Sequence, residues 1–400
     1  MLVLLISLLR VSEVFSRQTF DGLKSYDKYA LPTDGKNGPL LLKLNMNLLS
    51  IANMDLKYQT VSVKIDIELS WMDLYLVSLI HWTKGNVSTM SLDSTLVWVP
   101  DIMISTYGAY GVRLQSDHFG KLIVRSDGLV KAWVPVQVEL TIDAEITHYP
   151  FDVQTLNIYF SLWTLPNEHA VINVPTNAHP FRYYRENGEW SILSHKILLY
   201  NSVYDNQTYT DVLYTFIVQR QSLFPVLSLV VPVVLTSSLN VFVYILPVQG
   251  GERLTLCVSV FLTLAVFLSI LDQSLPKTSK GVSIFIVYLC LQLLGSALTI
   301  VSTCVVLNLY EQHQSSKRGC FYRFLSTILC KFETCKCCKG KPTNIWAAKQ
   351  TFNPNDREDK ELKENKSCLL VERIDMLLFL LSITWNVALL IMVVMTAILV

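Results

Sequence analysis

Four long stretches of this sequence contain no Asp, Glu, Lys or Arg, and all of them follow Arg220. They lie between Arg220 and Glu252, from Leu254 to Leu271, from Gly281 to Tyr310, and from Met376 to Val400. A membrane-spanning helix needs about 20 predominantly apolar residues, so each stretch can supply one. Buried core helices of a soluble protein would not need four such runs, and we expect a membrane protein.

The composition excludes several other classes of protein. Hydrophobic residues make up 51% of the chain and charged residues 16%, against about a quarter charged in soluble proteins. The net charge of +1 gives no electrostatic basis for binding nucleic acid. No nucleophile–base pair or phosphate-binding loop is visible, so we expect no enzyme and no cofactor. The histidines form no pair at helical ligand spacing, so we expect no metal site.

The first residues predict a signal peptide rather than a fifth span. A short apolar run from Met1 to Leu9 precedes small residues suited to cleavage near Ser16. If the next residues are secreted, the three spans that precede Lys317–Lys341 leave that segment inside, where seven basic residues accompany one acid, Glu333. The positive-inside rule favours that orientation. The expected order begins with a signal peptide at 1–16 and an extracellular domain at 17–220. A transmembrane region follows at 221–306, with helices near 223–246, 253–272 and 282–306. The chain then has a short intracellular segment at 307–374, which is basic and Cys-rich at first and then helical, and a last transmembrane helix at 375–400.

The secreted half has the pattern of β-strands. Apolar residues occupy every second position from Val61 to Trp71, which predicts a half-buried strand. Leu122–Val124 and Leu129–Leu140 flank an Asp-Gly turn and predict a hairpin. Several such runs predict a β-sandwich. Two sequons, at Asn86 and Asn206, predict N-glycosylation on this side.

The stretch after Arg253 carries a polar stripe at helical spacing. Steps of three and four residues place these side chains on one face: Thr255, Ser259, Leu262, Val266, Ser269 and Gln273. Several copies around an axis would line a water-filled pore and narrow it at Leu262 and Val266, and rings of apolar side chains gate pores by dewetting. Carboxylates at Glu252 and Asp272 would favour cations at the two mouths. The alternative is that Ser and Thr mediate helix packing, as they do in many membrane proteins.

These residues, with a set of motifs in the secreted half, resemble the pentameric ligand-gated ion channels, or Cys-loop receptors. Gly251-Glu-Arg253, Leu262 and Pro276 resemble the pore segment of that family. The secreted half carries similar motifs in the family's order: Trp71-Met-Asp, Trp98-Val-Pro-Asp-Ile, Gly128-Leu-Val-Lys-Ala-Trp-Val-Pro, Tyr149-Pro-Phe-Asp, Phe160-Ser-Leu-Trp-Thr and Asn187-Gly-Glu-Trp. The resemblance runs from about Leu40 to Val400 and is nearest to the cation-selective nicotinic and serotonin-type members.

The resemblance implies a fold, an assembly and a ligand site. Each subunit would be an extracellular β-sandwich plus a four-helix transmembrane bundle, with four further identical or homologous subunits around a central pore. A ligand would bind between adjacent extracellular domains, in an aromatic box. Trp163, Tyr200, Tyr204 and Tyr209 match the family's box or the loop that closes on it. Aromatic ring faces attract a protonated or quaternary amine by about 0.5 to 2 kcal/mol each.

The sequence departs from the family at the ligand site. Asp66 and Ser105 stand where aromatic residues are usual, although Tyr107 is close by, and a wider, more polar pocket would suit a cationic or a bulkier amphiphilic ligand. All nine cysteines lie at or beyond Cys257, so neither the family's disulfide nor the nicotinic cysteine pair is present. The positions that match the disulfide are Ile142 and Leu156, and we expect the loop to persist without it.

Coupling of ligand to pore in the family involves a set of positions near the membrane. Here they are Phe151, Asp152, Asp55, Arg220 and Pro276. Arg220 normally pairs with an acid where this chain has Leu56, so Asp55 or Asp152 must substitute, or else the charge lacks its partner.

The intracellular segment holds six cysteines, Cys320, Cys330, Cys335, Cys337, Cys338 and Cys368. Three interpretations of these cysteines are compatible with the sequence. They could form a palmitoylation cluster, they could be reduced thiols without a function, or they could form a zinc site of non-standard spacing.

We therefore expect a subunit of a pentameric, cation-selective ligand-gated channel in the plasma membrane, in contact with lipid and with its N-terminus outside, as at a synapse. The alternative is a non-conducting or accessory ligand-binding subunit of the same fold. The missing cysteine pairs and Leu56 favour that alternative, whereas the polar stripe favours conduction.

Overall fold

The computed structural model describes residues 23–33, 38–79, 88–106, 111–247, 251–277, 281–314 and 355–398. Contacts divide the chain into two compact units, which are described separately. The first comprises the residues up to Ile146, Phe151–Ser222 and Ser274–Thr278; the second comprises Thr147–Pro150, Leu223–Gln273 and Ser279 onward.

The first unit is a β-sandwich. One sheet has the strand order β3-β6-β7-β2-β1-β9, and the other has the order β10-β11-β8-β4-β5. The strands are β1 (Leu40–Asp55), β2 (Thr60–Met72), β3 (Thr89–Asp93), β4 (Ile102–Ser105), β5 (Val112–Arg113), β6 (Lys121–Arg125), β7 (Leu129–Thr141), β8 (Val153–Leu162), β9 (Ala170–Asn173), β10 (Trp190–Tyr204) and β11 (Gln207–Arg220). Two short helices, α2 (Leu74–Leu79) and α3 (Ser116–Phe119), lie between strands.

The alternation in the sequence explains how β2 forms the centre of its sheet. Successive side chains of a strand point to opposite faces, and the apolar set beginning at Val61 and ending at Trp71 is at most 1% exposed. β2 pairs with β1 on one side and β7 on the other. The predicted half-buried strand is confirmed.

The predicted hairpin is formed by β6 and β7. Gly128 has a φ of 87°, a conformation that glycine adopts without steric cost. Its N–H donates a hydrogen bond of 2.9 Å to the carbonyl of Arg125. A Cβ at this position would also lie 2.8 Å from the backbone oxygen of Asp73, so the turn requires glycine.

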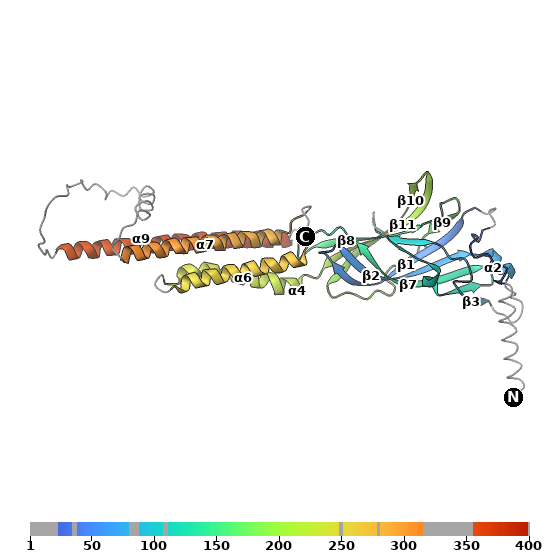
Figure 1. Cartoon of the computed structure of the whole chain (residues 1–400), viewed down its shortest axis with the longest axis horizontal. Coiled ribbons are helices and arrows are strands. Elements are labelled where there is room, and N and C mark those ends of the chain that lie inside the picture. Colours follow the sequence, from blue (N-terminus) through green and yellow to red (C-terminus); the bar gives the residue numbers. More distant parts are fainter. Residues whose placement is uncertain are drawn as a thin grey trace, which may run out of the picture. The chain divides into compact units, whose positions relative to one another are not determined.

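Four helical segments of the second unit are long and apolar enough to cross a membrane. The first, Leu223–Ile245, consists of α4 (Leu223–Pro225), the π-helix η1 (Val226–Val230), α5 (Val231–Phe242) and the 3₁₀-helix η2 (Val243–Ile245). The others are α6 (Glu252–Ser274), α7 (Ile284–Gln314) and α9 (Asn355–Ile398). α7 and α9 lie side by side (Figure 1). The β-sandwich and the four helices confirm the expected fold class.

Buried polar contacts join these helices to one another. The guanidinium of Arg253 on α6 is 1% exposed and donates to both carboxylate oxygens of Asp375 on α9, at 3.0 and 3.1 Å. It also donates to the carbonyls of Tyr244 and Leu246. Between α7 and α9, Gln292 donates to the side-chain oxygen of Asn386 at 3.1 Å. Such contacts contribute to helix association where lipid provides no hydrophobic drive.

Several of the sequence-based predictions lie outside the described residues. They are the signal peptide at 1–16, Tyr107, the sequon asparagine Asn86, and the cysteines Cys320, Cys330, Cys335, Cys337 and Cys338, together with the side chain of Cys368.

Candidate ligand site and pore helix

A long hairpin carries the three tyrosines of the predicted box. β10 and β11 pair over their whole length and turn at Asp205 and Asn206, whose φ angles are 48° and 61°. Two consecutive residues with positive φ indicate a type I′ turn, whose twist matches that of the strands. Tyr204, at the end of β10, is 75% exposed. The hairpin is labelled at β10 and β11 in Figure 1.

Register places several of the predicted residues on one face of the five-stranded sheet. Tyr200 lies opposite Asp211 on β11, and Asp211 lies opposite Ser161 on β8. Directly opposite residues share a face. Tyr209 is two residues from that row, so the alternation places it on the same face, and Trp163 directly follows the end of β8. Ser105 on β4 lies opposite Tyr159 of β8, which also belongs to this face.

The backbone beside Trp163 is held by Asp101. The N–H of Trp163 donates to the carbonyl of Asp101 at 3.1 Å, and the hydroxyl of Thr164 donates to its carboxylate at 3.1 Å. Arg113 completes the cluster with bonds of 2.5 and 2.6 Å to the same carboxylate. Trp163 as a residue is 56% exposed. The cluster fixes the backbone while the ring face stays available to a ligand.

The loop after Trp163 is tied to the hairpin through Asn167. The N–H of Asn167 donates to the carbonyl of Thr208 at 2.8 Å. Its side-chain oxygen accepts from the hydroxyl of Thr210 at 2.7 Å, and its amide donates to Asn201 at 3.3 Å. These bonds connect the segment that carries Trp163 to both strands that carry the tyrosines.

Asp211 is a candidate that the sequence reasoning missed. Its position opposite Tyr200 and two residues after Tyr209 places a carboxylate among the aromatic side chains. Burial raises the pKa of Asp211, and a side-chain hydrogen bond with Ser202 partly opposes that shift. The alternation along β11 was the signal that could have identified it, since every second residue from Tyr209 shares its face.

Asp66 lies in the other sheet. It is opposite Asn47 of β1 and Pro135 of β7, whereas Trp163 follows a strand of the five-stranded sheet. Burial raises the pKa of Asp66, and the carboxylate of Glu68 raises it further. Within one chain, therefore, Asp66 belongs to a different sheet from the other box residues.

The polar stripe of α6 forms one exposed face of that helix. All six of its members are exposed: Thr255, Ser259, Leu262, Val266, Ser269 and Gln273. The opposite face is buried at Arg253, Cys257, Val260, Leu264 and Leu271. Glu252 and Asp272, near the two ends of the helix, are exposed. Thr and Ser along the helix donate to carbonyls one turn earlier, as from Ser259 to Thr255 at 2.8 Å.

Comparison with known protein families agrees with the motifs in both the N-terminal and the C-terminal half of the chain. Residues 16–222 match the model of the neurotransmitter-gated ion-channel ligand binding domain, and residues 229–376 match that of the neurotransmitter-gated ion-channel transmembrane region. The chain belongs to the neurotransmitter-gated ion-channel family. It is therefore a multi-pass membrane protein of a channel family rather than of an enzyme family, as the motifs indicated.

Neuronal acetylcholine receptor subunits are among the relatives. The chain is 30% identical over 300 residues to the alpha-2 subunit of Gallus gallus, covering 73% of this chain and 55% of the relative. It is 28% identical over 299 residues to the alpha-2 subunit of Homo sapiens, with the same coverage. The beta-4 subunit of Bos taurus is 28% identical over 319 residues, which cover 76% of this chain and 62% of the relative. The matched region is thus little more than half the length of the alpha-2 relatives.

This family member holds its disulfide-free loop by hydrogen bonds. Gln154, which is 1% exposed, accepts from the N–H of Glu145 at 3.0 Å and donates to its carbonyl at 2.7 Å. Ile142 and Leu156, at the predicted base of the loop, are buried at 7% and 0% exposure. The described cysteines, Cys257, Cys290 and Cys304, are free thiols.

The partner of Arg220 is Asp152. The guanidinium donates to the two carboxylate oxygens at 2.7 and 3.2 Å. Asp55 accepts instead from the N–H of Tyr58 at 3.1 Å, which places it in a local turn. Of the other predicted coupling positions, Phe151 is half-buried and Pro276 is buried.

Proposed function

We propose that this chain is a subunit of a pentameric, cation-selective channel in the plasma membrane, opened by a small cationic or amphiphilic ligand. The observation that carries the proposal is the exposed face of α6, which has hydroxyl and amide side chains toward its two ends and the apolar Leu262 and Val266 between them. A polar face of this kind is explained if five such faces surround water.

The ligand would bind between neighbouring N-terminal domains. One subunit contributes Trp163, Tyr200, Tyr204, Tyr209 and Ser105, with Tyr107 as an expected member; its neighbour contributes Asp66. The placement of Asp66 in the other sheet supports this division. Asp211 adds a carboxylate, so aromatic faces and a negative charge together would attract an ammonium group.

The gate would lie at Leu262 and Val266, and the acids would select cations. Glu252 precedes the stripe, and Asp272 lies near its far end. Rings of carboxylates favour cations at the mouths of pores. Phe151, Asp152, Asp55, Arg220 and Pro276 would couple ligand binding to this gate.

The same proposal includes the topology. Residues 1–16 would be removed, residues 17–220 would be extracellular with glycans at Asn86 and Asn206, and residues 307–374 would be intracellular. The proposed membrane partners are four further subunits and lipid.

Expression of the chain alone in oocytes tests conduction. Under voltage clamp, quaternary and primary amines should evoke inward current, and Leu262→Thr should make the channel open at lower ligand concentration, because a hydroxyl weakens an apolar gate. If the unmodified chain and Leu262→Thr both reach the cell surface and neither conducts current, the chain does not form a homomeric channel. Glu252→Ala should shift the reversal potential in a sodium gradient, and Trp163→Ala should reduce affinity for the active amine.

A non-conducting or accessory subunit is the second candidate. It is favoured by the missing cysteine pairs, whereas the ion pair of Arg220 with Asp152 weakens the argument from Leu56. Silence of the chain alone, with current restored when a neuronal acetylcholine receptor subunit is co-expressed, would support it.

A further inference from the structure

A basic residue directly follows the acid at the start of the proposed pore helix. Glu252 and Arg253 are the first two residues of α6. Rings of carboxylates favour cations in a pore, whereas rings of Arg or Lys favour anions. Five guanidinium groups beside five carboxylates would therefore cancel much of the selectivity that Glu252 provides, unless the charge of Arg253 is compensated.

The helix directs the two charged side chains to different sides. Residues three or four positions apart share a face of a helix. Glu252 thus lies on the face of Thr255, and both residues are exposed. Arg253 shares its face with Cys257 and Val260, which are buried, and Arg253 itself is 1% exposed. The positive charge is therefore placed behind the exposed stripe and inside the second unit.

The guanidinium of Arg253 is held there by four hydrogen bonds. Nη1 and Nη2 donate to the two carboxylate oxygens of Asp375 on α9, at 3.0 and 3.1 Å. Nη2 also donates to the carbonyls of Tyr244 at 3.1 Å and of Leu246 at 2.7 Å. A bidentate bond between Arg and a carboxylate is among the strongest hydrogen-bonded contacts in proteins and fixes the orientation of both groups.

Asp375 supplies the negative charge of this cluster. Arg stays protonated in proteins, and the two carbonyls carry no net charge. Within the described part of the chain, the carboxylate of Asp375 is the acid that forms an ion pair with Arg253. If Asp375 were neutral, a full positive charge would remain next to Glu252, whether the guanidinium stayed buried or turned toward water.

We propose that Asp375 is a positioning residue for the cation selectivity of the pore, a role that rests on the proposed channel function. It holds Arg253 on the buried face of α6 and compensates its charge, so that the carboxylate of Glu252 determines the electric field at this mouth. The two members of the pair are 122 positions apart in the sequence. The last helix of the chain thereby acts on ions that it does not touch.

Reversal potentials in oocytes test this role of the charge. Each chain carries Leu262→Thr, is opened with trimethylphenylammonium, and is measured while external sodium chloride is diluted. Asp375→Asn should lower the permeability ratio of sodium to chloride at least about threefold, because an uncompensated charge acts on cations and anions with opposite sign. Adding Arg253→Gln to Asp375→Asn should restore the ratio, since no charge is then left to compensate. A ratio unchanged by Asp375→Asn, or not restored in the double variant, would overturn the proposal.

A packing variant separates charge from the attachment of α9. Asn386→Leu removes the bond of 3.1 Å that Asn386 accepts from Gln292 of α7, and it changes no charge. The permeability ratio should then stay that of the parent chain. An equal fall in the ratio with Asn386→Leu would show that looser packing of α9 is the cause, which also overturns the proposal.

Co-expression covers the case in which Asp375→Asn does not reach the surface alone. Pentamers that mix unmodified and Asp375→Asn subunits contain fewer uncompensated guanidinium groups. Their permeability ratio should fall in the same direction by a smaller factor. Mixed channels with the ratio of the unmodified chain would count against the proposal.

Arginine labelling tests the ion pair without any current. In the purified full chain in lipid nanodiscs, the reaction of Arg253 with phenylglyoxal is followed by mass spectrometry. Its rate should rise at least about tenfold in Asp375→Asn, which corresponds to the loss of one charge-assisted hydrogen bond, and should not change in Asn386→Leu.

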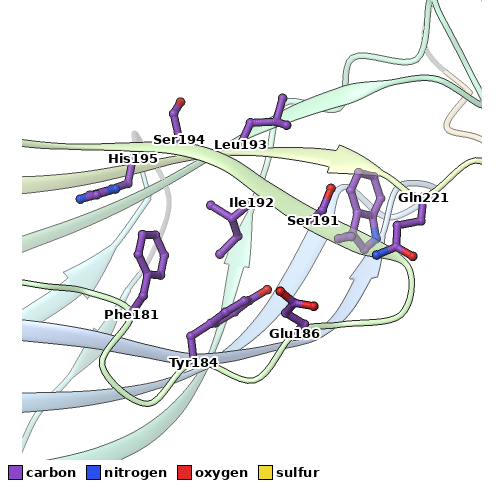
Figure 2. Close-up of a pocket in the computed structure, with 10 residues that line it drawn as sticks. Phe181, Tyr184, Glu186, Ser191, Ile192, Leu193, Ser194, His195 and Gln221 are labelled. Atoms are coloured by element: carbon purple, nitrogen blue, oxygen red, sulfur yellow. The ribbon is translucent and has the colours of Figure 1, made fainter.

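The internal standards for this labelling are Arg182 and Arg185. They belong to the segment from Phe181 to Glu186, which lines a hollow of the first unit (Figure 2), and both are exposed. Their rates should be the same in all variants. A chain that reaches the surface but never conducts would contradict the proposed function, and the labelling then decides on Asp375. Arg253 that stays as unreactive in Asp375→Asn as in the unmodified chain would show that Asp375 does not hold it.

Discussion

Arg220 donates two hydrogen bonds to Asp152, whose side chain is 1% exposed. The same carboxylate accepts from the amide of Gln154 at 2.7 Å, and Gln154 in turn bonds to the backbone of Glu145 across the disulfide-free loop. One buried carboxylate therefore joins the last strand of the sandwich to that loop. In this chain a buried charge, and not a covalent bond, connects that loop to the strand.

Asp152→Asn should destabilise the N-terminal unit. Asn keeps the shape of Asp but removes the charge of the carboxylate that accepts both hydrogen bonds from the mostly buried guanidinium of Arg220, and breaking a buried pair costs about 3 to 5 kcal/mol. We expect a clear fall in the thermal unfolding midpoint of the purified chain. The control is Asp127→Asn in the exposed pair with Arg125, which should change stability by less than about 1 kcal/mol. Equal effects of the two substitutions would contradict the role of burial.

The elements with a regular pattern were predictable from the sequence. The alternation from Val61 to Trp71 predicted β2, and the Asp-Gly turn before Leu129 predicted the β6–β7 hairpin, because period and turn chemistry are local properties. The four apolar helices followed from the gaps in charge. The family motifs confined the ligand-site candidates to a few positions.

Contacts between distant segments were not predictable in this way. The sequence left Asp55 and Asp152 as alternative partners of Arg220, because nothing local shows that Asp55 caps its own turn. The pair formed by Arg253 and Asp375 joins residues that are 122 positions apart, and Asp211 became a candidate only when its cross-strand partners were known. Register and side-chain packing decide these contacts, and a single sequence does not state them.

The two faces of α6 should differ in chemical accessibility. We expect Ser259→Cys and Ser269→Cys, on the exposed face, to react with 2-aminoethyl methanethiosulfonate in a chain whose other cysteines are replaced by Ser. Val260→Cys and Leu264→Cys, which are buried, should react at least about tenfold more slowly, because reaction requires access to the thiolate. The rate is measured as loss of current or by mass spectrometry. Similar rates on both faces would exclude a water-filled path along the stripe.

Binding of a quaternary amine should weaken on acidification through Asp211. Because burial raises the pKa of this carboxyl above the ordinary 3.8 expected for Asp, it takes up its proton at a higher pH than a free Asp and then loses its attraction for a cation. Trimethylphenylammonium keeps its charge at all pH values, so only the protein titrates. Affinity should fall as the pH decreases, by roughly tenfold in all.

Asp211→Asn isolates that titration. The variant should bind trimethylphenylammonium less tightly than the unmodified chain at neutral pH, and the two should converge in acid. The same titration of Asp66→Asn shows how much of the pH dependence comes from Asp66, because burial raises the pKa of that carboxyl also. A difference between the unmodified chain and Asp211→Asn that stays constant with pH would show that this carboxylate does not act through its charge.

The tip of the β10–β11 hairpin should carry a glycan. Asn206 is exposed at the turn, and its φ of 61° is a conformation in which Asn and Asp are several-fold enriched. Asn206→Asp and Thr208→Ala each destroy the sequon, the first with a residue that suits the turn and the second without touching Asn206. Each should remove one glycosidase-sensitive step from the gel mobility, whereas Asn201→Asp should not. Because glycan transfer to such sequons takes place on the lumenal side, loss of that step would also place the hairpin, and the ligand site beside it, outside the cell. An unmodified Asn206 in surface-expressed protein would contradict the prediction.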